Sequence, residues 1–109
     1  MKYLLSILTF CCVLFLGLNS RFANYQAGSL TAKQQAIIPI ASYTATGDLN
    51  NLKTAVNEGL DNGLTINETK EIMVHLYAYC GFPRALNGLA TVDEVLSERQ
   101  SKNIHDTMG

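Results

Sequence analysis

Charge is scarce in this sequence, and neither sign is in excess. Charged residues make up 16% of the 109 residues, and the formal net charge is -1 at pH 7 with histidine neutral. A nucleic-acid-binding protein needs a basic surface to neutralise phosphates, so we expect no nucleic-acid partner. The length allows at most one small domain.

Alternating strand patterns are also lacking. No segment repeats apolar and polar residues with a period of two, which excludes a β-rich fold and predicts an all-α protein. Helix signals divide the chain instead. Two capping boxes, TAKQ at 31–34 and TINE at 65–68, mark helix starts, because each threonine and the side chain three residues later satisfy each other's backbone N–H groups.

These signals predict four helices. The first begins at the Thr31 cap and ends at Gly47, with Pro39 either kinking it or splitting it in two. Asp48 caps the second. The second, third and fourth helices are predicted at 49–62, 66–80 and 83–100.

The first twenty residues, MKYLLSILTFCCVLFLGLNS, do not belong to the helical domain. Their basic start, apolar run at 3–18 and small-residue end are typical of a signal peptide cleaved after Ser20. We therefore expect a periplasmic or secreted bacterial protein. The apolar run falls only slightly short of the roughly 20 residues that cross a bilayer, so the alternative is a membrane anchor through residues 3–18.

Cysteine is scarce as well. Of the three cysteines, Cys11 and Cys12 lie in the signal segment, and cleavage leaves Cys80 without a partner for an intrachain disulfide. A redox role for Cys80 would need a thiol from another subunit or molecule. We interpret Cys80 as a small buried hydrophobe, with redox chemistry as the alternative.

The two ends of the mature chain are polar. Residues 21–29 are interpreted as a flexible lead-in, and residues 99–109 as a polar, turn-rich tail that continues the last helix into a linker. The helical domain is predicted at 30–98.

Leu30–Leu96 resembles the carboxymuconolactone decarboxylase family of the alkylhydroperoxidase D-like superfamily. The most specific elements are GLT at 63–65, the helix that carries Glu71 and His75, and YCGFPRALN at 79–87. The resemblance implies an all-α subunit that assembles into trimers or hexamers. It also implies either peroxide reduction by a Cys-x-x-Cys pair with a histidine, or proton transfer on a lactone acid.

The chain departs from both chemistries. Asp48 and Asn51 stand where the resemblance places the two cysteines, and Ala55 stands where it places the histidine. Dithiol peroxidase activity is therefore not expected. Lactone-processing members commonly keep that histidine too, so the resemblance leaves open whether catalysis survives.

Any proton transfer would rely on His75, with Glu71 one turn earlier to hold its ring. Arg84 can receive a substrate carboxylate, and Tyr79 and Asn87 can add hydrogen bonds. The alternative interpretation of Glu71 and His75 is a surface pair with no chemistry. No cofactor is expected, and no metal site, because His75 and His105 are far apart in sequence.

Four short helices bury only about 60% of the surface that the unfolded chain exposes, so we expect self-association. The chain corresponds to one helical repeat, whereas larger relatives carry two. Three hypotheses follow. The protein is an exported domain that acts on a small lactone or organic acid, a non-catalytic oligomerisation module, or a thiol-redox protein that uses Cys80 across subunits.

Overall fold

The computed structural model describes residues 3–4, 6–7 and 29–109. Most of the predicted signal peptide (1–20) and lead-in (21–29) lies outside these described residues. The chain divides into two units, Met1–Leu30 and Thr31–Gly109, and the second contains the helical domain. No helix in the described part combines the length and apolar character that a bilayer crossing requires.

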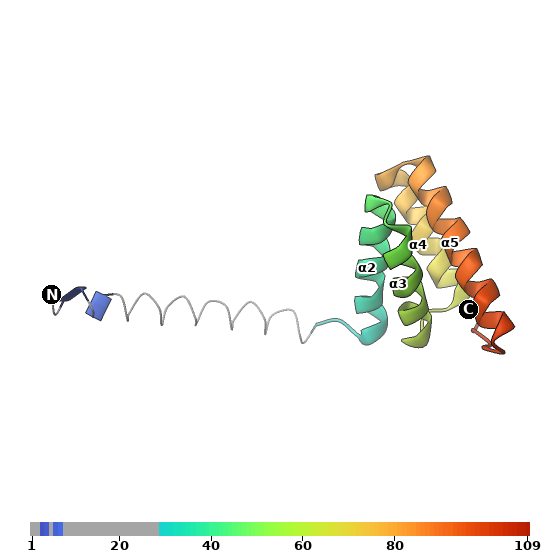
Figure 1. Ribbon diagram of the computed structural model, residues 1–109, viewed down its shortest axis with the longest axis horizontal. Helices are drawn as coiled ribbons and strands as arrows, with labels where there is room; N and C mark the ends of the chain where they lie inside the picture. Colours follow the sequence, from blue (N-terminus) through green and yellow to red (C-terminus); the bar gives the residue numbers. More distant parts are fainter. Residues whose placement is uncertain (1–2, 5, 8–28) are drawn as a thin grey trace. The chain divides into compact units, whose positions relative to one another are not determined.

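Four helices make up the second unit, and the described residues include no strand, so the all-α prediction is confirmed. The helices run alternately up and down (Figure 1). Both α2 and α5 pack against α3 and α4. The helix bounds are α2 (Ala32–Thr46), α3 (Leu49–Asp61), α4 (Ile66–Cys80) and α5 (Phe82–Ser101).

Both predicted capping boxes are confirmed. The Gln34 backbone N–H donates to Thr31 Oγ1 at 3.1 Å, and the Thr31 N–H donates to Gln34 Oε1 at 3.0 Å. At the start of α4, the Glu68 N–H donates to Thr65 Oγ1 at 3.1 Å, and the Thr65 N–H donates to Glu68 Oε2 at 2.9 Å. These local bonds satisfy N–H groups that have no partner inside a helix, and so they set where α2 and α4 begin.

The other helix ends follow the sequence within two residues. α2 remains one helix through Pro39, which excludes a split, one of the two alternatives predicted for this proline. It ends at Gly47, whose φ of 74° lies in the left-handed region that favours glycine. α5 begins at Phe82, one residue earlier than predicted, and Pro83 lies in the first turn, where its missing N–H costs no hydrogen bond.

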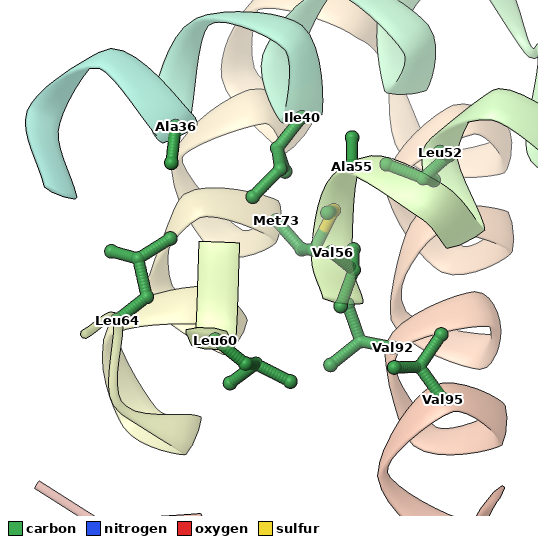
Figure 2. Close-up of a cluster of buried hydrophobic side chains, with 10 residues drawn as sticks. All are labelled: Ala36, Ile40, Leu52, Ala55, Val56, Leu60, Leu64, Met73, Val92 and Val95. Atoms are coloured by element: carbon green, nitrogen blue, oxygen red, sulfur yellow. The ribbon is translucent and has the colours of Figure 1, made fainter. Parts of the chain in front are cut away.

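The core contains side chains from all four helices (Figure 2). Its fully buried members are Ile40 of α2, Leu52 and Val56 of α3, Met73 of α4, and Val92 and Val95 of α5. Burial of one such aliphatic side chain contributes about 1.5 to 3 kcal/mol. Because every helix supplies at least one of these residues, the bundle forms as a unit.

The C-terminal tail differs from the expected linker. α5 extends to Ser101, and the chain then folds back onto the start of α4. The N–H groups of Ile66 and Asn67 donate to the carbonyl oxygens of Thr107 and Met108, both at 2.9 Å. The first N–H groups of a helix have no partner within it, so the tail supplies the acceptors that α4 lacks.

Arg99 holds the tail in this position. Its side chain is only 7% exposed, and it donates to both carboxylate oxygens of Asp106 at 2.8 Å. It also donates to Asp61 at 2.9 Å and to Asn57 at 3.3 Å, both on α3. The hydrogen bonds to Asp106 have the largest effect on the pKa of the guanidinium, and the hydrogen bond to Asp61 adds to it. Together they outweigh the effect of burial and raise this pKa. Arg99 therefore joins α5, α3 and the tail.

Replacing Asp106 with asparagine should release the tail. The change removes the charge that pairs with a buried guanidinium, so we expect a loss of about 3 kcal/mol in the free energy of unfolding. Hydrogen exchange at the Ile66 and Asn67 amides should become faster. Urea denaturation and amide exchange measure the two effects.

Asp93→Asn is the matched control, because Asp93 forms an exposed ion pair with Lys70 at 3.0 Å. Such a pair contributes less than about 1 kcal/mol. Equal losses for the two variants, or unchanged exchange at Ile66 and Asn67 in Asp106→Asn, would contradict the assigned role of Asp106.

Candidate functional site

A groove of about 860 Å³ lies between α2 and α4. Its apolar lining consists of Ile37, Ala41, Leu64, Ile72 and Leu76. Gly109 of the tail also lines it, so the docking of the tail shapes one part of the groove. The volume lies within the range of small-molecule sites, which are mostly apolar with a few polar groups.

Three of the predicted site residues line this groove. Glu71, His75 and Tyr79 follow one another at four-residue spacing on α4, which places them along one side of the helix. All three are exposed, and Tyr79 is 82% exposed. In the described part of the chain no hydrogen bond or ion pair joins Glu71 to His75, so the expected support of the ring by Glu71 is absent.

An ion pair that the sequence analysis did not identify crosses the groove. Lys33 Nζ of α2 lies 2.7 Å from Glu68 Oε1 of α4. This contact, followed by the backbone hydrogen bond from Thr65, lowers the pKa of the Glu68 carboxyl. The capping box indicated a structural role for Glu68, but its pairing with Lys33 depends on the packing of α2 against α4 and has no local signal.

The predicted carboxylate receptor, Arg84, does not line the groove. Its guanidinium occupies the space that a side chain at Gly47 would fill, beside the C-terminal end of α2. Partial negative charge gathers at this end of a helix, so a cation there is stabilising. The structure therefore does not bring Arg84 to His75 as expected.

Asn87 and Cys80 also lie outside the groove lining. The Asn87 carbonyl oxygen accepts a hydrogen bond from Thr91 Oγ1 at 2.9 Å, and the residue itself is exposed on α5. Cys80 is a free thiol at the last residue of α4, and it is partly buried rather than fully buried as expected. The described residues contain no group of three or more potential ligands that could hold a metal ion.

The three positions that replace the dithiol motif have structural roles. Asp48 caps α3, where it accepts from the Asn51 backbone N–H at 3.2 Å and from the Asn51 side-chain amide at 2.6 Å. Ala55 is 3% exposed and packs in the core. A histidine side chain at position 55 would not fit this packing without rearrangement, because protein interiors are close-packed.

Comparison with known proteins agrees with this architecture. The family model described as carboxymuconolactone decarboxylase family matches residues 17–94, which is most of the chain. A comparison with curated proteins gave no match. The four-helix bundle, with its GLT turn and its Gly-Phe-Pro junction between α4 and α5, thus belongs to the carboxymuconolactone decarboxylase family.

Proposed function

We propose that the protein binds a small lactone or organic acid in the groove between α2 and α4, and that His75 transfers a proton there. The observation that supports this proposal is the shared placement of Glu71, His75 and Tyr79 on one apolar groove. Imidazole is the side chain that most often acts as an acid or base in enzymes. Tyr79 can donate a hydrogen bond to a ligand oxygen.

The chemistry proposed for His75 does not require the missing histidine at position 55. The imidazole is exposed on the groove and is free to contact a ligand. Glu71 lies one helical turn earlier and can accept a hydrogen bond from the ring once a ligand orders both side chains. Because Arg84 lies elsewhere, the described residues of the groove lining include no arginine that could bind a carboxylate in a bidentate manner.

Proton transfer can be measured as deuterium uptake from D₂O at the acidic ring carbon of a butenolide. We expect the full-length protein to accelerate this exchange above the buffer rate. His75→Ala should reduce the acceleration about a hundredfold, the lower range for loss of a general acid or base. Proton NMR of the butenolide measures the rate.

His105→Ala supplies the control, because His105 is the other histidine of the chain and does not line the groove. It should leave the exchange rate unchanged. Equal rates for the native protein and His75→Ala would refute the role of His75.

A second proposal is that the protein assembles with copies of itself, and an exposed apolar surface supports it. We name this surface the α4/α5 seam, consisting of Val74, Tyr77, Phe82 and Leu86, which are 46% to 58% exposed. The rings of Tyr77 and Phe82 meet edge to face, with centroids 5.6 Å apart. Contiguous apolar patches of this kind mark interaction sites.

The seam and the groove lie on different flanks of α4. Tyr77 contacts Phe82 at the start of α5, and Val74 lies one turn before Tyr77 on α4. His75 and Tyr79 line the groove instead. Assembly through the seam would therefore leave the groove open. Self-association through the seam is compatible both with a ligand in the groove and with a non-catalytic assembly module.

Phe82→Lys should disrupt this assembly, because it places a charge in a surface that must lose its water. We expect the mass measured by light scattering to fall toward that of one subunit. Leu49→Lys is the control, since Leu49 is 40% exposed on α3 and lies outside the seam. A monomeric native protein, or an oligomer that survives Phe82→Lys, would rule out the seam as the interface.

We also propose export through residues 1–20, with the anchor at 3–18 as the alternative. The apolar run and the small residues that follow it support cleavage after Ser20. Intact mass of the exported protein distinguishes the two, because cleavage gives a chain that begins at Arg21 and an anchor retains the full mass.

A further inference from the structure

We infer that Glu71 makes the groove select an uncharged lactone and exclude carboxylates. This inference rests on the proposed function, because it concerns the same groove. The proposed function allows a lactone or an organic acid as ligand, whereas this inference allows only a lactone without a free carboxylate. The side chain that discriminates between the two is Glu71.

The charges that line the groove do not balance. At pH 7, with histidine neutral, Lys33 is the one cationic side chain among the described residues that line the groove. Its ammonium group is paired with the Glu68 carboxylate at 2.7 Å. Glu71 is exposed and has no ion pair or hydrogen-bond partner in the described part of the chain. One side-chain carboxylate is therefore uncompensated, and the side chains that line the groove have a net negative charge.

The position of Glu71 makes this charge effective. It lies one turn from Glu68 and one turn from His75, between the ion pair and the proposed acid–base residue. Four residues of helix correspond to about 6 Å along the axis. A ligand that contacts His75 thus holds its polar group near Glu71, where a carboxylate would be repelled.

A lactone avoids this repulsion. Its carbonyl oxygen accepts hydrogen bonds and carries no net charge, so Tyr79 or the His75 ring can donate to it without a carboxylate being placed near Glu71. The hydroxy acid formed when the ring opens has the same carbon skeleton and one negative charge. The lactone and the hydroxy acid therefore differ in charge, and the negative charge of Glu71 repels only the acid.

The test compares γ-octalactone with the hydroxy acid formed by opening its ring. Each is titrated into the full-length protein at about pH 8, above the usual titration range of histidine. Amide chemical shifts of the groove residues report binding. We expect the lactone to bind about fivefold or more tightly than the acid, the ratio expected for two like charges a few ångströms apart in water.

Glu71→Gln should remove this preference, because the loss of the negative charge strengthens the binding of the acid relative to the lactone. Glu58→Gln is the matched control, because Glu58 is exposed on α3 and does not line the groove, and it should keep the native preference. Glutamine keeps the size of the side chain, and thermal unfolding of each variant verifies that it folds.

The outcomes separate this inference from the proposed function. If the acid binds as tightly as the lactone, or if the preference for the lactone persists in Glu71→Gln, the inference is overturned while ligand binding in the groove stands. If neither molecule shifts the groove amides, groove binding itself fails, and the inference fails with it.

Discussion

The buried guanidinium of Arg99 is the interaction on which the rest of the structure depends. It bonds to α3 through Asp61 and to the tail through Asp106, and the tail in turn provides acceptors for the first N–H groups of α4. α4 has Glu71, His75 and Tyr79 on its groove side. The site is therefore held in part by a contact outside the groove lining, and a change at Asp106 acts on the start of α4 and on Gly109 of the tail, which lines the groove.

Our proposals centre on α4 because each of its sides has a different neighbour. Thr69 and Met73 are buried in the core, and the flank toward α2 lines the groove. The flank toward α5 contributes Val74 and Tyr77 to the seam. A helix that is apolar on more than one side needs more than one partner, which is the physical reason for our proposal of self-association.

Membership of the carboxymuconolactone decarboxylase family describes the fold of this chain more closely than its chemistry. The positions that would carry a dithiol and its histidine are used here for a helix cap and for core packing, at Asp48 and Ala55. The acid–base groups that remain lie on α4, in a groove whose charge is negative rather than positive. These groups on α4 are the basis of our proposals.

The sequence alone determined the helices and several of their ends. Thr31 with Gln34, Thr65 with Glu68, and Gly47 act through bonds or backbone angles within a few residues, so their effect can be predicted locally. The spacing of Glu71, His75 and Tyr79 likewise placed them on one side of a helix before any packing was known.

Only the tertiary structure decided where the charges are paired. Lys33 meets Glu68 and Arg99 meets Asp61, and the members of each pair are more than thirty residues apart in sequence. Ion pairs of this kind depend on which helix packs against which, and no local pattern contains that information.

The tail was misjudged for the same reason. Its polar residues are typical of a linker in isolation, and they become a docked segment only because Arg99 and the start of α4 present unmatched hydrogen-bonding groups to it.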